Sequence, residues 1–313
     1  WLTSFTKGTR FDKPEPEPEL NTYLNAIMLD IAAPIAAVAQ MQEMLGRARS
    51  YLTSQIEAGG LVRYHGRPDA STIGVLGCAI TPDSDDTALV WRVAPGEDRA
   101  RLAAALRTMR QFRTSDGLYR TWLAQRADFQ CLDPGSDPNP ADIGIQMHLY
   151  LLLAQEDPTA ARALCQALMQ RSGDGNIWVY YSGAPLMAVL RLADLHRAGC
   201  PLQLPASRLQ PADARQEMWL RAVSLINRMN STPRNPEAHA EAIRLLRELA
   251  SSDFAALASN PPLLYHNDMT ATVRRYYWSR EVGYALWLRL YYGTKGIGPQ
   301  PEPSHSAPEV AGR

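Results

Sequence analysis

The chain has 313 residues, of which 46% are hydrophobic and 20% are charged, and its formal net charge is zero. This composition can bury a sizeable core, and the balanced charge gives no reason to expect nucleic acid or an anionic membrane as the main partner. Runs of about 18 apolar residues, which would predict a membrane-spanning helix, do not occur in the sequence.

The two ends of the chain differ in composition from its middle. Residues 1–20 include DKPEPEPEL and are predicted to form an extended Pro/Glu-rich N-terminal arm. Residues 296–313 are predicted to be a disordered Pro-rich tail. Residues 21–295 then form a single domain. The chain begins at Trp1 rather than Met, the pattern of a processed or trimmed chain, so the sequence leaves the compartment open.

The dominant pattern between the two ends is helical. Apolar residues recur every three to four positions most clearly in residues 157–173, 212–230 and 236–258. The first of these segments opens on an Asp–Pro pair and closes on Gly173, as a helix does. No alternating segment is long enough to predict a β-strand of useful length.

A helical unit recurs along the chain. Three segments each end a predicted helix and contain a glycine followed by an apolar residue and aromatic residues: QIEAGGLVRY, RTSDGLYRTW and RSGDGNIWVY. Their glycines Gly60, Gly117 and Gly175 are 57 and 58 residues apart, and a loop and a new helix follow each one. One helical hairpin cannot bury its apolar face alone, so the units must stack. Their size predicts a closed ring of roughly five or six hairpins.

The segment PDSDDTALV places Asp83, Asp85 and Asp86 at the start of a predicted helix. One interpretation is structural, because an acidic N-cap and acidic first turn satisfy free backbone N–H groups and the helix dipole. The other is catalytic, because acids forced together can hold a proton near neutral pH. From the residues alone, both interpretations stay open.

A second acidic stretch, CLDPGSDPNPADIG, lies at the equivalent place of the next unit. It contains Asp133, Asp137, Asn139 and Asp142. A Pro/Asp turn followed by an N-cap is the favoured interpretation. A divalent-cation site is the alternative, although the spacing is not that of a known calcium loop.

PDSDDTALV resembles the DxDDTA motif of class II terpene cyclases, such as squalene–hopene cyclases. The glycine turns resemble the QW repeats of that family, with Gln55, Gly59 and Leu61 in the first turn. The resemblance covers roughly residues 47–199 and implies an all-α fold, a single α/α-toroid. Family members carry two toroidal domains with the active site between them, and this chain has room for one.

The resemblance implies acid-initiated cyclisation of an isoprenoid, or another apolar small molecule, without a metal or cofactor. Asp85 would be the proton donor, and Asp83 and Asp86 would orient it and retain the proton. Aromatic faces would stabilise the cation. The residues assigned to substrate binding are Trp91, Trp178, Tyr180, Tyr181, Tyr276, Tyr277, Trp278, His266 and Asp142.

Two other functions stay open. The chain could be a non-catalytic toroid that binds a lipid or a partner protein at its acidic, aromatic end, and a second protein chain could also supply the missing domain. Less favoured is a carbohydrate-active toroid with paired carboxylates. His148 is interpreted as an interior histidine, on a mostly apolar helix.

The four cysteines are widely spaced, at Cys78, Cys131, Cys165 and Cys200. No CxxC pair occurs, which excludes a zinc ribbon and a thioredoxin-type motif. Buried free thiols are favoured over two disulfides. A zinc site that uses Cys131 with a nearby Asp and a remote His is a weak alternative.

Overall fold

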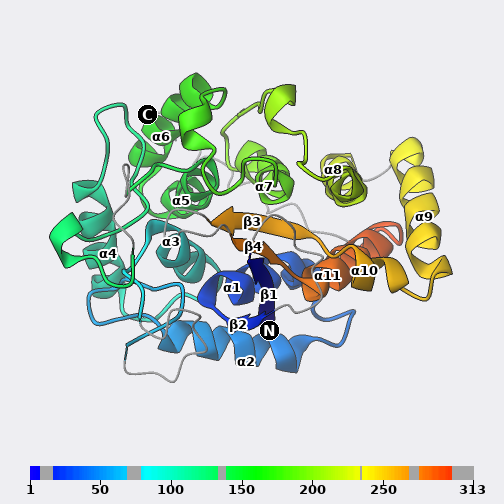
Figure 1. Ribbon diagram of the computed structural model, residues 1–313, viewed down its shortest axis with the longest axis horizontal. Helices are drawn as coiled ribbons and strands as arrows, with labels where there is room; N and C mark the ends of the chain where they lie inside the picture. The colour runs from blue at the N-terminus through cyan, green and yellow to red at the C-terminus, as the bar shows by residue number, and fades with distance from the viewer. Residues whose placement is uncertain (8–16, 69–78, 133–138, 233–234, 268–274, 298–313) are drawn as a thin grey trace, which may run out of the picture.

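The computed structural model describes residues 1–7, 17–68, 79–132, 139–232, 235–267 and 275–297. These residues are mostly helical, which confirms the all-α prediction at that level. Six helices contact one another in a closed order, in which each packs against the next and the last packs against the first. They are α1 (Thr22–Ala32), α3 (Ser84–Val93), α5 (Ile143–Glu156), α7 (Leu186–Arg197), α8 (Glu217–Ser231) and α11 (Arg280–Gly293). Figure 1 shows most of them nearly end-on around the centre.

Further helices pack outside these six. They are α2 (Gln42–Ser54), α4 (Arg99–Gln111), α6 (Pro158–Arg171), α9 (Pro236–Ser251) and the short α10 (Ala255–Ser259). Figure 1 places α2, α4, α6 and α9 at the periphery. The sequence explains the division. α5 is buried without a break from Ile143 to Leu153, whereas α2 buries only three residues along one face.

The predicted order of helix, glycine turn, loop and helix is confirmed three times, for α2 to α3, α4 to α5 and α6 to α7. In the first turn, Gly60 has φ +81°, and a Cβ built there would lie 2.1 Å from the carbonyl oxygen of Arg101. Gly117 in the second turn has φ +90°. Gly175 instead opens a short 3₁₀ turn, so the third turn does not share this conformation.

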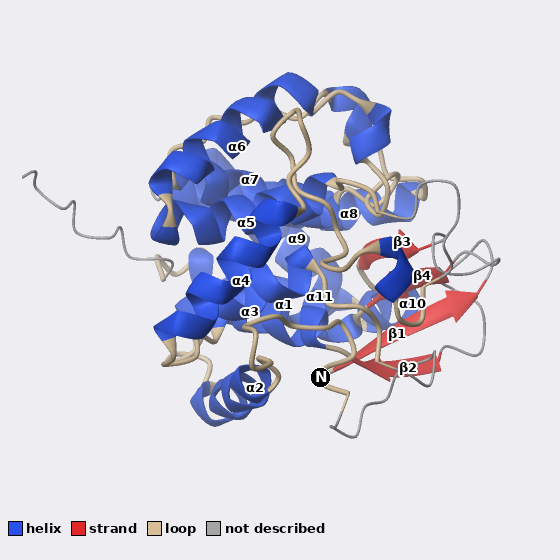
Figure 2. Cartoon of the chain, turned by 90° about the vertical axis from the view of Figure 1, so that its left-hand side faces the viewer, coloured by secondary structure: helices blue, strands red, loops and turns tan. Residues whose placement is uncertain are grey.

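A four-stranded antiparallel sheet lies at one end of the helices (Figure 2). Its strands are β1 (Leu2–Lys7), β2 (Glu17–Leu20), β3 (Leu263–Asn267) and β4 (Arg275–Trp278), in the order β2-β1-β4-β3. Two predictions were therefore wrong. The chain does form strands, and residues 1–20 contribute β1 and β2 to the fold instead of forming a separate arm. Residues 298–313, most of the predicted tail, lie outside the described part of the chain.

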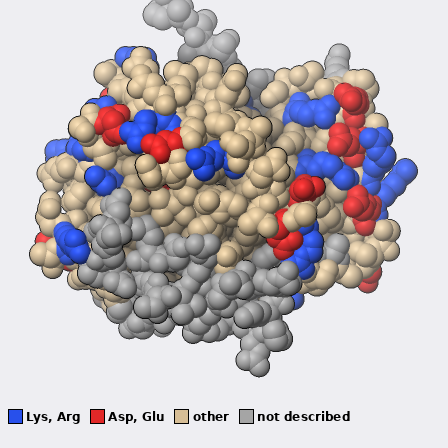
Figure 3. Space-filling model, turned by 45° about the horizontal axis from the view of Figure 1, so that its top comes forward, with Lys and Arg blue, Asp and Glu red and all other residues tan. Residues whose placement is uncertain are grey.

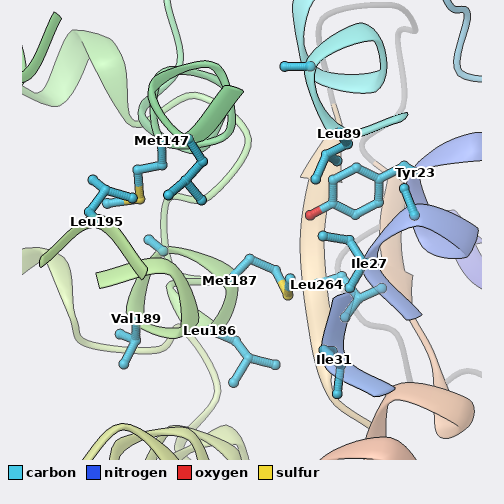
Figure 4. Packing of buried hydrophobic residues seen from close by; sticks show 14 of the residues in the cluster. Tyr23, Ile27, Ile31, Leu89, Met147, Leu186, Met187, Val189, Leu195 and Leu264 are labelled. Atoms are coloured by element: carbon cyan, nitrogen blue, oxygen red, sulfur yellow. The ribbon is translucent and has the colours of Figure 1, made fainter. Parts of the chain in front are cut away.

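One continuous hydrophobic core joins the helices. Figure 4 shows Tyr23 and Ile27 of α1 facing Met187 of α7, with Leu264 of β3 beside them. The strand therefore contributes to the same core as the helices. On the surface, Figure 3 shows groups of basic and acidic side chains lying close together, in keeping with the zero net charge.

A disulfide joins Cys165 on α6 to Cys200, just after α7, with a Cα–Cα distance of 5.7 Å. Cys131 is also disulfide-bonded. Cys78 lies outside the described residues. The prediction of free thiols was therefore wrong for Cys165, Cys200 and Cys131. Spacing in the sequence gave no indication of the bridge, because α6 and α7 bring its two cysteines together.

Within the described ranges, no helix combines the length and the apolar character needed to cross a bilayer.

Candidate functional site

Asp83, Asp85 and Asp86 lie at the amino-terminal end of α3. Asp83 is the N-cap, and its Oδ1 accepts a hydrogen bond from the backbone N–H of Asp86 at 2.7 Å. Asp83 and Asp86 are each 2% exposed, whereas the side chain of Asp85 is 13% exposed. The capping interpretation is therefore confirmed for Asp83. A solvated cap does not account for the burial of two acids in a single turn.

Burial raises the pKa of both enclosed acids. The pKa of Asp83 is raised well above its usual range by burial and by the neighbouring charges of Asp86 and Asp85. Burial and the charge of Asp85 raise the pKa of Asp86 to about 7, although the Thr22 hydroxyl, which donates to Asp86 Oδ1, opposes the shift. Asp83 Oδ2 is buried without a hydrogen-bond partner in the described structure. Burial therefore favours the protonated form of Asp83, and Asp86 titrates near neutral pH.

Asp85 contacts a histidine from the next helix in the ring. Its Oδ1 lies 2.5 Å from Nδ1 of His148 on α5. On the other side of the imidazole, Nε2 accepts a hydrogen bond from Nε of Arg191 at 3.1 Å. A guanidinium can only donate, so Nε2 carries the lone pair and the proton lies on Nδ1. Burial lowers the pKa of His148 although Asp85 opposes this, so the imidazole is neutral and donates to Asp85.

Arg191 on α7 is itself held by carboxylates at the far end of the helices. Its NH1 bonds to Asp30 Oδ2 on α1 and, at 3.0 Å, to Asp194 Oδ2. Arg92 donates to both oxygens of Asp30. Burial acts to raise the pKa of Asp30, but Arg191 and Arg92 outweigh it and hold that pKa well below its usual range. A chain of polar contacts thus runs from Asp85 through the core to Arg92.

Tyrosine rings lie between this chain and the sheet. The Tyr23 ring centroid is 6.3 Å from that of His148 and 5.1 Å from that of Tyr265 on β3. The Tyr23 and Tyr181 hydroxyls are 2.9 Å apart, and Tyr265 stacks on Tyr277 at 4.5 Å between centroids. Of the predicted substrate-binding residues, Tyr181 and Tyr277 therefore belong to the aromatic layer next to His148. Tyr23 and Tyr265 complete it.

Two predicted tryptophans lie elsewhere. Trp91 is buried, and its indole N–H donates to the carbonyl of Gly60 at 2.7 Å. Trp178 is also buried, and its indole N–H donates to the carbonyl of Ser172 at 2.8 Å. Each fastens a repeat turn to the core. These bonds give both indoles a structural role, and their assignment to substrate binding stays a prediction.

The remaining predicted substrate-binding residues lie near the sheet, and their contacts differ. Trp278 is buried beside Ala184 and Leu263, and Tyr276 packs against that cluster. His266 is buried, with Nε2 2.8 Å from the carbonyl of Ser182 and its backbone N–H donating to the carbonyl of Tyr180. These contacts fix β3 to the loop before α7. Tyr180 has an electrostatic link to the acids, since burial raises its pKa and Asp142 and Asp83 add to that effect.

Asp142 has a structural role. Its Oδ1 caps α5 through the N–H of Gly144 at 2.8 Å, and its Oδ2 accepts from the N–H groups of Val179 and Tyr180 at 2.8 and 2.9 Å. Burial raises its pKa to about 7 against these hydrogen bonds. Asp142 therefore ties the third repeat turn to α5, and its assignment as a binding residue stays a prediction.

The metal alternatives gain no support. Asn139 uses its side chain on both backbone groups of Trp122, and Asp133 and Asp137 lie outside the described residues. Cys131 is disulfide-bonded, so it cannot serve as a thiolate ligand for zinc. Among the residues that the structure describes, no group of three or more His, Cys, Asp or Glu side chains is arranged to hold a metal ion.

Sequence reasoning missed the residues that support Asp85: His148, Arg191, Tyr23 and Thr22. A signal was present, because a lone polar residue inside an apolar helix must find a partner. His148 in IQMHLYLLL and Arg191 in LMAVLRLADLH are of this kind. Their partners lie on other helices, and the sequence does not reveal which ones.

Comparisons of the chain with protein-family models, curated proteins and solved structures found no match.

Proposed function

We propose that the six contacting helices form an α/α-toroid and that Asp85 is the general acid of a terpene cyclase-like enzyme. The fold proposal is supported by the cyclic order of helix contacts and by the outer helix, turn and inner helix order of three units. The observation that carries the functional proposal is the contact of Asp85 with His148, beside two acids whose pKa values burial raises.

The arrangement suits a proton donor. A neutral His148 donates from Nδ1 to Asp85 Oδ1 and so stabilises the carboxylate that remains after the proton leaves. Arg191 fixes the tautomer by donating to Nε2. Because Asp83 holds its proton and Asp86 is close to doing so, the turn does not carry three negative charges.

In the proposed reaction, the Asp85 proton passes to one carbon of a substrate alkene, whose π electrons form the new C–H bond. The adjacent carbon becomes a cation, which the next double bond attacks to close a ring. Loss of a proton from the final cation gives a cyclic isomer, and Asp85 is reprotonated. The tyrosine layer of Tyr23, Tyr181, Tyr265 and Tyr277 offers ring faces for cation stabilisation.

The substrate class proposed is an isoprenoid or another uncharged apolar molecule, and the reaction as proposed uses no cofactor. A second protein chain that completes the site fits the same proposal. The disulfides support an oxidising compartment, outside the cytosol.

The test is conversion of squalene, farnesyl diphosphate, geranylgeranyl diphosphate and a lipid extract of the host, followed by mass spectrometry. The protein is expected to produce an isomer of unchanged mass, and Asp85→Asn to produce none. Asp98→Asn, at the exposed N-cap of α4, is the matched control that keeps activity. Absence of conversion across the panel would favour the non-catalytic alternative, a toroid that binds a lipid or a partner protein.

A further inference from the structure

A cavity of about 150 Å³ opens at the end of the helices opposite to Asp85. It lies at the carboxyl ends of α1, α7, α8 and α11. Arg191 and Arg289 lie in its wall. The wall also includes Asp194, Arg197, Asn227 and Asn230. The volume is enough for a group of several heavy atoms or for a few water molecules.

Arg289, in this wall, forms no ion pair with a carboxylate of the described residues. Within the described part of the chain, its one hydrogen bond goes from NH1 to the backbone carbonyl of Ile31 at 3.3 Å. Burial lowers the pKa of Arg289 to about 10, against the attraction of Asp194 and Asp30. Partial burial removes hydration from the guanidinium, and without an ion pair this loss is not compensated unless an anion binds.

Arg191 contributes a second free donor. The residue is 2% exposed, and its NH2 group is buried without a hydrogen-bond partner in the described structure. Its Nε and NH1 are already used by His148, Asp30 and Asp194. The cavity is therefore lined by Arg289 and by Arg191, and the NH2 group of Arg191 is enclosed without a partner in the described structure.

The carboxylates of the wall are occupied by other arginines. Asp30 accepts bonds on both oxygens from Arg92 and Arg191. Asp194 accepts on Oδ2 from Arg191 and on Oδ1 from Arg197. Three guanidinium groups therefore share two carboxylates in this region, and Arg289 adds a fourth positive charge beside them.

We infer that this cavity binds a small oxyanion, a phosphate or carboxylate group, between Arg289 and the NH2 of Arg191. A guanidinium fork matches two oxygens of such a group. Asn230 lines the cavity beside it, whereas the amide of Asn227 already donates to the carbonyl of Val189 at 2.8 Å. The helix carboxyl ends carry partial negative charge, which favours the arginines but not an anion. Direct hydrogen bonds must therefore supply the affinity.

The site would also be linked to Asp85. Arg191 donates to His148 at 3.1 Å, and His148 contacts Asp85 at 2.5 Å. An anion at the cavity weakens the field of Arg191 on the imidazole, which makes protonation of His148 easier. This link does not depend on what Asp85 does.

The experiment is calorimetric titration of the full chain with inorganic phosphate and, separately, with acetate, each against chloride at equal ionic strength. Binding of at least one of them at a single site is expected. Arg289→Gln should weaken it by about tenfold or more, since a charge-assisted bidentate contact is lost. Arg221→Gln, which removes a surface arginine paired with Glu248, should leave it within about twofold. The anion that binds more tightly shows whether the site takes a phosphate or a carboxylate group.

A stability measurement separates a ligand site from a structural role. Without added anion, Arg289→Gln is expected to keep or raise the melting temperature, because it removes a partly buried charge that has no carboxylate partner. The inference is overturned if neither anion binds below about 50 mM. It is equally overturned if Arg289→Gln leaves the affinity unchanged, or if that variant melts lower and binds normally. None of these outcomes depends on catalysis.

Discussion

Asp85 and His148 are 63 residues apart in the chain and meet with Oδ1 and Nδ1 2.5 Å apart, across the contact between α3 and α5. The imidazole is enclosed completely and the carboxyl side chain partly. Arg191 reaches the same imidazole from α7. Three consecutive helices of the ring therefore fix the orientation of one acid, and this relationship is the basis of the proposed chemistry.

His148→Phe should lower turnover in the proposed reaction by about 10²-fold, because the donor that stabilises the Asp85 carboxylate is lost. His148→Gln keeps an N–H donor of similar reach and should recover part of the rate. The pH profile of kcat gives the second readout, since losing the donor moves its alkaline limb, on which the general acid loses its proton, to higher pH. Equal activity in the wild type and in His148→Phe would contradict a positioning role for His148.

Asp83→Asn should stabilise the protein, and more so as pH rises. The folded-state pKa of Asp83 is raised, so the folded protein binds a proton that the unfolded chain releases above its pKa of about 3.9. Wild-type stability is therefore lost progressively as pH rises above about 4. Asparagine keeps the capping oxygen for the Asp86 N–H and removes this loss.

The measurement is the difference in melting temperature between Asp83→Asn and wild type at pH 4, 6 and 8. We expect this difference to grow with pH. It should correspond to a gain in the free energy of unfolding on the order of 1–3 kcal/mol. Taking the difference removes the contribution of His148, whose lowered pKa makes the stability of both proteins rise with pH. Asp98→Asn, on an exposed cap, should show no such growth. A difference independent of pH would contradict the protonated state of Asp83.

Asp142→Ala should destabilise the fold by about 2–4 kcal/mol, since three buried N–H groups lose their acceptor. Asp98→Ala also removes a helix cap, but an exposed one, and should cost about 1 kcal/mol. Urea unfolding of both variants gives the comparison. Similar losses for the two variants would show that Asp142 does not hold the third repeat turn to α5.

Reduction of the Cys165–Cys200 bridge should cost about 4 kcal/mol by the chain-entropy relation, because 35 residues separate the two cysteines. Urea unfolding of Cys165→Ser/Cys200→Ser, compared with the oxidised wild type, measures the loss. The same variant should then be insensitive to a reductant at this bridge. Unchanged stability in the double variant would mean that the bridge does not constrain the unfolded chain.

Local features of the fold could be predicted from the sequence. The Asp–Pro start of α6 and the cap at Asp83 are signals that neighbouring residues supply, and both are present in the structure. The sheet could not be predicted in this way. β1 pairs with β4 across more than two hundred residues, and the Pro/Glu-rich β2 lacks the alternation of a strand.

The candidate site could also be predicted only in part. The acids at Asp83, Asp85 and Asp86 were visible as a motif, because they lie within one turn of the chain. Which of them is enclosed and which contacts a histidine depends on α1, α5 and α7, and so on the tertiary structure. Trp91 and Trp178 were assigned to a binding role because aromatic residues suit a cation. Their indole N–H bonds to backbone hold the repeat turns, a role that depends on tertiary contacts and that the sequence did not reveal.

The most direct measurement is product analysis after reaction in D₂O with the isoprenoid panel. Proton donation by Asp85 predicts a cyclic product that carries one non-exchangeable deuterium at the carbon where cyclisation began, and no product from Asp85→Asn. A cyclic product without deuterium, or one formed equally by Asp85→Asn, would contradict acid initiation by Asp85.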